Sequence, residues 1–132
     1  MIFPSVPDAA ALVGRIALGA LFLVHGVPKI RDLQKPVGWV KSTGWPGGEI
    51  FAVLFSLLEF FGGIALIVGL LTQFVAFLFF LEMIATTIFS ITKLQKKLVL
   101  GYELDLAYAA FALVLSFLGP GALSLDRILG IA

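Results

Sequence analysis

Four long apolar stretches constrain this chain more than any other feature. We place them at 9–27, 49–69, 72–92 and 101–118, separated by segments rich in glycine, proline or charge. A helix needs about 20 apolar residues to cross the hydrocarbon core of a bilayer. Because 61% of the 132 residues are hydrophobic, a soluble domain of this size could not bury so much apolar surface. The sequence therefore predicts an all-α integral membrane four-helix bundle with up-down-up-down topology, as a single domain over residues 1–132.

The segments around these stretches predict how the spans are joined. Residues 1–8 hold two prolines and an acid, with no basic residue before the apolar run, so we expect no removable signal peptide and a first helix that stays in the mature protein. Pro28 should kink or end the first span, although residues 29–35 could carry on as an interfacial turn. The glycines and prolines between residues 31 and 48 predict a loop, and residues 69–72 leave room only for a tight hairpin.

Basic residues outside the spans predict the orientation. Lys29, Arg31, Lys35 and Lys41 follow the first span and Lys93, Lys96 and Lys97 follow the third, whereas the other side has only Arg127. By the positive-inside rule, both basic loops are cytoplasmic and both termini lie outside, in a multi-pass protein of the cell membrane. The net charge of +1 indicates no nucleic-acid partner.

Ionisable side chains inside the apolar spans are the candidate site. Arg15, Glu59 and Glu82 lie near the centres of three spans, and His25 lies further along the first. Such groups are costly in hydrocarbon, usually face the bundle interior, and often mark functional sites. Helical periodicity puts small and polar residues on the same faces, which should point inward. These are Gly19, Phe22, Gly26 and Lys29 with Arg15, and His25 at the edge of that face; Ala52, Ser56 and Gly63 with Glu59; Phe79 and Thr86 with Glu82; and Asp105, Ala109, Ala112 and Ser116 on the fourth span.

Aligning the span midpoints predicts a triad in the middle of the bilayer. Glu59 and Glu82 fall near the midplane, with Arg15 about one helical turn away. We expect Arg15 to pair with Glu59, in bidentate geometry. One arginine facing two carboxylates leaves an excess negative charge, so one glutamate should be neutral and able to exchange a proton. A purely structural Arg15–Glu59 ion pair, and a protonated Glu82 bonded to Thr86 or Ser90, are the alternatives left open.

A second polar layer is predicted toward the cytoplasmic end. His25 should lie there at the depth of Tyr102, Glu103 and Asp105, and of the two acids we favour Asp105 as its neighbour, because the two acids point to nearly opposite faces. We expect no metal site, because His25 is the only histidine and the chain has no cysteine. The same lack of cysteine excludes disulfide and thiol chemistry by this chain alone.

Several motifs together resemble the DoxX family of small four-helix membrane proteins. They are Arg15, HGVPK at 25–29, GWP at 44–46, EFFGG at 59–63, GLLT at 69–72 and the tail GPGALSLD at 119–126. The resemblance implies that Arg15, His25, Lys29 and Glu59 form the family's polar core. It also implies a mixed range of functions, which includes membrane subunits of thiosulfate:quinone oxidoreductase, a partner in a mycobacterial oxidoreductase complex, and chaperone-like members.

These observations predict that the chain is a component of a membrane oxidoreductase system and that it binds a quinone or similar lipophilic redox molecule inside the bundle. Glu59, Glu82 and His25 would exchange protons, and Arg15, Glu59, Lys29 and Asp105 would bind the ligand. No residue here carries electrons, so a partner protein would have to supply the electron carrier. The alternatives are a scaffold or assembly factor for a partner protein and, ranked lower, a small transporter. Whether the chain forms a homo-oligomer stays open.

Overall fold

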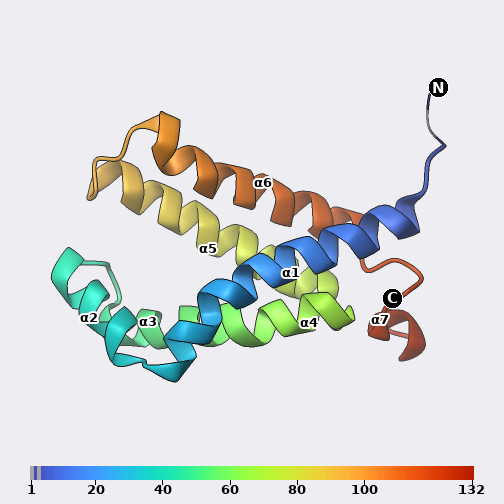
Figure 1. Ribbon diagram of the computed structural model, residues 1–132, viewed down its shortest axis with the longest axis horizontal. Coiled ribbons are helices and arrows are strands. Elements are labelled where there is room, and N and C mark those ends of the chain that lie inside the picture. The colour runs from blue at the N-terminus through green and yellow to red at the C-terminus, as the bar shows by residue number, and fades with distance from the viewer. Residues whose placement is uncertain (1, 3) are drawn as a thin grey trace.

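The computed structural model describes residues 2 and 4–132, and every regular element in that part of the chain is a helix (Figure 1). Helix α1 (Pro7–Arg31) is the first span. The second span, Gly48–Val68, is a continuous rod formed by α3 (Gly48–Leu57), a π-helical turn η1 (Leu58–Gly62) and α4 (Gly63–Val68). Helix α5 (Thr72–Thr92) is the third span, and a bent turn η2 (Leu98–Tyr102) leads into α6 (Glu103–Leu118), the fourth. All four spans are long and apolar enough to cross a membrane, which confirms the predicted four-helix membrane fold.

Two short helices lie outside the spans. Helix α2 (Gln34–Thr43) lies in the connection after α1, and α7 (Leu125–Ile128) lies in the segment after α6. In Figure 1, α2 and the α5–α6 connection lie at one end of the bundle, while the start of α1 and α7 lie at the other. The turn between α4 and α5 is as tight as predicted, with Gly69 at φ 76° and Leu71 at φ 50°.

Helix α1 packs backbone to backbone against the second span. A Cβ atom on Gly19 would lie 2.7 Å from the carbonyl oxygen of Gly63, and one on Gly63 would lie 2.8 Å from the carbonyl oxygen of Gly19. One on Gly26 would lie 2.6 Å from the backbone nitrogen of Phe60. Small residues allow this approach, which in lipid supplies the van der Waals contact that holds helices together. These glycines therefore fix the register of the two spans.

Helices α5 and α6 form the second close pair, and an apolar core joins the two pairs. The rings of Phe22 on α1 and Phe79 on α5 stack with centroids 3.8 Å apart. The inward faces predicted from periodicity are confirmed by burial of Ser56, Ala109 and Ala112, among others. The outward faces carry large, exposed apolar side chains, as is required of a surface in contact with lipid.

The loop predicted for residues 31–48 is wrong, because this segment contains α2. Pro36 is tolerated since it occupies the first turn, where backbone N–H groups have no intrahelical partner. Gly44, at φ 72°, ends the helix in the left-handed conformation typical of a C-terminal cap. Val40 packs with Trp45 and Phe89 in a small second core. Helix α1 also continues one turn past Pro28, to Arg31.

Arg15 closes the end of the bundle that holds the chain ends. Its side chain is fully buried, and its guanidinium donates hydrogen bonds of 3.2 Å to the carbonyls of Leu66 and Ile67 at the end of α4. It also donates to the carbonyl of Leu123 in the C-terminal tail. The last carbonyls of a helix lack intrahelical partners, and Arg15 supplies donors for them. This arrangement holds the tail against the end of the second span.

Asp126 completes the same closure from the tail side. Its carboxylate accepts hydrogen bonds from the backbone N–H groups of Leu71 at 2.6 Å and Thr72 at 2.9 Å, at the start of α5. Its own N–H donates to the carbonyl of Gly69 at 2.9 Å. An acid at a helix N-terminus is favourable because it accepts from free N–H groups and complements the helix dipole. We call Arg15, Asp126 and the backbone groups they bind the tail clasp.

We predict that Asp126→Asn destabilises the protein, because the asparagine NH₂ cannot accept from the second buried N–H donor. The expected loss is about 2 kcal/mol in the free energy of unfolding. The thermal midpoint in neutral detergent should fall measurably. Asp32→Asn is the matched control, since the Asp32 carboxylate accepts only one exposed N–H, from Gln34. Equal midpoints for wild type and Asp126→Asn would contradict this account of the clasp.

Candidate functional site

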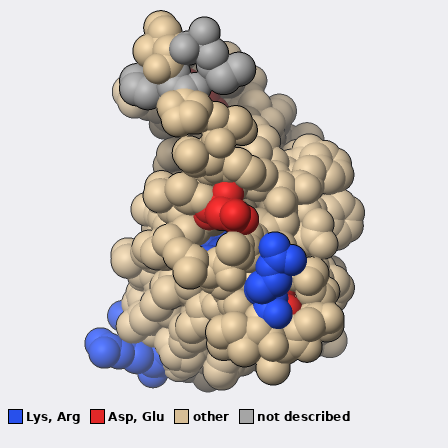
Figure 2. Space-filling model, turned by 90° about the vertical axis from the view of Figure 1, so that its right-hand side faces the viewer, with Lys and Arg blue, Asp and Glu red and all other residues tan. Residues whose placement is uncertain are grey.

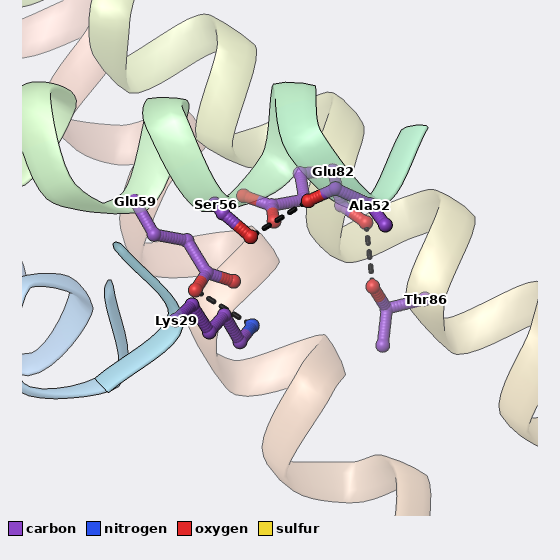
Figure 3. A network of polar contacts seen from close by, with 6 residues as sticks. All are labelled: Lys29, Ala52, Ser56, Glu59, Glu82 and Thr86. Carbon is purple, nitrogen blue, oxygen red and sulfur yellow. Dashed lines mark hydrogen bonds and ion pairs between the residues drawn. The ribbon is translucent and has the colours of Figure 1, made fainter. Parts of the chain in front are cut away.

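A partly buried ion pair between Lys29 and Glu59 joins the first two spans (Figure 3), away from the tail clasp. The Nζ atom of Lys29 on α1 lies 2.7 Å from Oε2 of Glu59 in η1. The Glu59 side chain is 7% exposed and that of Lys29 is 36% exposed, so the cation reaches inward from the rim of the bundle. Paired charges at this depth are characteristic of functional sites in membrane proteins.

Local backbone structure explains why the two charges meet. Glu59 lies in the π-helical turn η1, an irregularity that interrupts the second span and that is common at functional sites. Gly26 rests directly on this turn, with no room for a side chain between the two backbones. Lys29 follows Gly26 by three residues and therefore extends from the same face of α1. The close contact at Gly26 places the ammonium group beside the Glu59 carboxylate.

Glu82 on α5 adds a second carboxyl group to this site. Its side chain is 4% exposed and lies beside Glu59 and within electrostatic reach of Lys29. The Oε2 atom of Glu82 is buried without a hydrogen-bond partner among the described residues. The alternative in which Thr86 or Ser90 binds this carboxyl is wrong, because Thr86 donates to the backbone carbonyl of Glu82 at 2.9 Å and Ser90 to Asp105 at 3.1 Å.

A cavity of about 190 Å³ opens beside the ion pair, between α1, η1, α5 and α6. Its polar lining residues are His25, Lys29, Glu59, Asp105 and Tyr108, and its apolar ones are Leu21, Phe22, Met83 and Leu104. As predicted, Asp105 rather than Glu103 shares a site with His25. Glu103, the first residue of α6, instead accepts a hydrogen bond from the N–H of Leu100. We call this the acid cavity.

The predicted pairing of Arg15 with Glu59 is wrong. Arg15 belongs to the tail clasp, whereas Glu59 pairs with Lys29. The reason is the register of the two antiparallel spans, in which Gly19 lies against Gly63 and so places Arg15 beside Ile67, near the end of α4. Arg15 is also absent from the lining of the acid cavity, which argues against its predicted role in ligand binding.

Sequence reasoning missed two partners that the fold supplies. Lys29 is predicted on the same helix face as Gly26 and among the ligand-binding residues, but the sequence analysis pairs Glu59 with Arg15 and not with Lys29. Asp126, the carboxylate that acts electrostatically on Arg15, was quoted only as part of the tail motif. Its position in a short tail carries no periodicity from which a contact with α5 could be read.

The chemistry available in the acid cavity is proton transfer and hydrogen bonding. It combines an ammonium group, three carboxyl groups including the adjacent Glu82, an imidazole and a phenol within an apolar wall. Such a set can bind carbonyl or hydroxyl oxygens of a largely apolar molecule and exchange protons with them. Among the residues that the structure describes, no group of three or more His, Cys, Asp or Glu side chains could hold a metal ion.

Several known proteins are similar to this chain over most of its length. The chain is 32% identical to the inner membrane protein YqjF of Escherichia coli, across 92% of this chain and 93% of that protein. It is 26% identical to the inner membrane protein YphA of the same organism, across 95% and 94%, and 28% identical to a Bacillus subtilis protein named "Putative oxidoreductase CatD", across 90% and 86%. No solved structure gave a significant match. The DoxX family model matches residues 10–92, and this multi-span membrane protein therefore belongs to the DoxX family.

Proposed function

We propose that this protein is the quinone-binding component of a membrane oxidoreductase system, with the head group of a quinone or similar lipophilic redox molecule bound in the acid cavity. The observation that carries this proposal is a buried carboxyl oxygen on Glu82 that has no hydrogen-bond partner within residues 2 and 4–132, beside the Lys29–Glu59 ion pair and a cavity that opens to the outside of the bundle. The similarity to a Bacillus subtilis protein named as a putative oxidoreductase supports the same class.

The size of the acid cavity suits a ring rather than a whole lipid. Sites that enclose drug-sized ligands measure about 300–1,000 Å³, and this cavity of about 190 Å³ is smaller. The ring of a quinone would lie inside, while its isoprenoid tail would remain in the bilayer. Lys29, His25 and Tyr108 would donate to the ring oxygens, and Phe22 and Met83 would contact the ring.

A charge count assigns the proton to the carboxyl pair. Lys29 contributes one positive charge, and Glu59 and Glu82 would contribute two negative charges if both were ionised. Burial of an uncompensated charge costs several kcal/mol, so we propose that the two carboxyl groups share one proton. Reduction of a quinone to a quinol consumes two electrons and two protons. The carboxyl pair would deliver protons to the ring oxygens and regain them from the aqueous side through the exposed His25.

The electrons must come from elsewhere, because none of this chain's side chains forms a redox centre and it has no cysteine. A flavin, haem or thiol on a partner protein would supply them in this proposal. The opposing scaffold hypothesis gains support from one observation, which is that Arg15 binds only backbone carbonyls in the tail clasp. The acid cavity distinguishes the two hypotheses, since a scaffold requires no ligand there.

We also propose that the end of the bundle with α2 and the 93–97 segment faces the cytoplasm. Lysines concentrate at that end, and the surface around the chain ends is mostly uncharged, with only isolated acidic and basic side chains (Figure 2). The positive-inside rule assigns the lysine-rich end to the cytoplasm.

Quinone binding is tested with the purified full chain in neutral detergent. A short-tailed quinone should raise the thermal midpoint, and solvent extraction of the membrane-purified protein should release endogenous quinone. Tyr108→Phe, which removes a donor to the ring oxygens, should weaken binding about fivefold, the typical effect of one neutral hydrogen bond. Glu103→Gln on the same helix is the control, because it lies outside the acid cavity. No extracted quinone and an unchanged midpoint would favour the scaffold.

The shared proton is tested by infrared spectroscopy. A protonated buried carboxyl group gives a C=O band that shifts on exchange into D₂O. Glu82→Gln should remove this band, because the remaining Glu59 then pairs with Lys29 as a carboxylate. Glu103→Gln should leave it unchanged. Persistence of the band in both Glu82→Gln and Glu59→Gln would show that the proton is not held by this pair.

The orientation is tested with single cysteines, which the cysteine-free sequence makes unambiguous. In intact cells, a membrane-impermeant maleimide should label a cysteine that replaces Ala132 and spare one that replaces Lys96. After the cells are opened, both should react. The reverse pattern in intact cells would overturn the proposed orientation.

A further inference from the structure

A second, larger cavity lies on the other side of the ion pair, between the end of α1, α2 and α3. It has a volume of about 380 Å³, within the range of ligand sites in proteins. It is lined by Pro28, Lys29, Lys35, Pro36, Trp39, Val40, Ala52, Phe55 and Ser56. We call it the lysine cavity. It shares only Lys29 with the acid cavity.

The lining of the lysine cavity combines positive charge with an apolar wall. Its two ionisable side chains are Lys29 and Lys35, and no acidic residue is among the described residues that line it. Lys29 is paired with Glu59, whereas Lys35 makes neither of the two ion pairs found in the described part of the chain. Trp39, Val40 and Phe55 supply apolar surface. A cavity of this kind favours a ligand with an anionic head and a hydrocarbon part.

Its position identifies the source of such a ligand. The cavity lies at the lysine-rich end of the bundle, where α2 lies outside the spans (Figure 1). Trp39 on its rim is 46% exposed, as is typical of a tryptophan at the boundary between lipid tails and water. Basic pockets between transmembrane helices at such a boundary bind the head groups of anionic lipids.

We propose that the lysine cavity is a binding site for an anionic phospholipid. The phosphate group lies between the ammonium groups of Lys29 and Lys35, and an acyl chain lies along Val40 and Phe55. The site goes beyond the proposed redox function, because it occupies a different cavity and requires no quinone. Since Lys29 borders both cavities, a bound phosphate competes with Glu59 for this cation. Lipid binding is therefore linked to the charge balance of the Glu59–Glu82 pair.

Tryptophan fluorescence tests the proposal, because Trp39 lines the cavity and the ring centroid of Trp45 lies 6.1 Å from that of Trp39. The full chain in neutral detergent is titrated with short-chain phosphatidylglycerol, with phosphatidylcholine of the same chains, and with glycerol phosphate. Only phosphatidylglycerol should give a saturable change in emission. Equal binding of phosphatidylcholine would overturn the anionic site, and equal binding of glycerol phosphate would assign the site to free anions in place of lipid.

Two lysine variants separate the cavity from general surface charge. Lys35→Gln removes a cavity lysine that has no ion-pair partner, and it should weaken phosphatidylglycerol binding about fivefold, which corresponds to about 1 kcal/mol per lysine at an anionic membrane surface. Lys96→Gln removes an exposed lysine outside the cavity and should leave the affinity unchanged. Equal losses in the two variants, or none with Lys35→Gln, would overturn the proposal. Because both lysines are exposed, both variants should fold.

Discussion

The contact between the backbones of α1 and the second span determines the rest of this structure. Gly19 meets Gly63, and Gly26 meets the π-helical turn at Phe60, at distances that leave no room for a Cβ atom. Apolar side chains gain little by leaving lipid for another apolar surface, so close van der Waals contact and buried hydrogen bonds must hold a membrane bundle together. Glycine contacts at two levels, seven residues apart on α1, permit one register and no sliding.

That register separates the buried charges into two centres with different chemistry. At one end, the two terminal nitrogens of Arg15 donate to helix-terminal and tail carbonyls, and Asp126 accepts from the first N–H groups of α5. These groups have fixed partners within the protein and are suited to holding the tail in place. In the other centre, Lys29 and Glu59 form a pair beside two cavities, and Glu82 has a buried oxygen that finds no partner in the described part of the chain. A buried carboxyl group beside a cavity can be completed by a proton or a ligand, and for this reason we propose that the functional chemistry belongs to this second centre.

Lys29 connects the two cavities of that centre. It extends from the last turns of α1, one side of which faces α2 and α3 while the other faces α5 and α6. Its long flexible side chain, 36% exposed, can follow a charge on either side, whereas the planar, fully buried guanidinium of Arg15, held by three backbone carbonyls, cannot. The difference between a mobile ammonium group and a fixed guanidinium separates a site that can respond to ligands from one that only stabilises the fold.

Much of the fold could be predicted from the sequence, because the length of apolar runs and their helical periodicity depend only on local physics. Hydrophobic length determined the four spans, and small and polar stripes determined their buried faces, including the place of Glu59 and Glu82 in the interior. The tertiary structure alone decided which charges meet. Span midpoints predict the depth of a residue only to within a helical turn or more, whereas an ion pair requires atoms within about 4 Å. The alignment of the spans is also shifted by the π-helical turn, by the continuation of α1 past Pro28 and by the folding of α2. The sequence by itself thus determined that a cation must neutralise Glu59 inside the bundle. The register set by the glycine contacts decided that this cation is Lys29 and that Arg15 binds the tail. The physical reason is that contact between two spans depends on packing that neither span encodes alone.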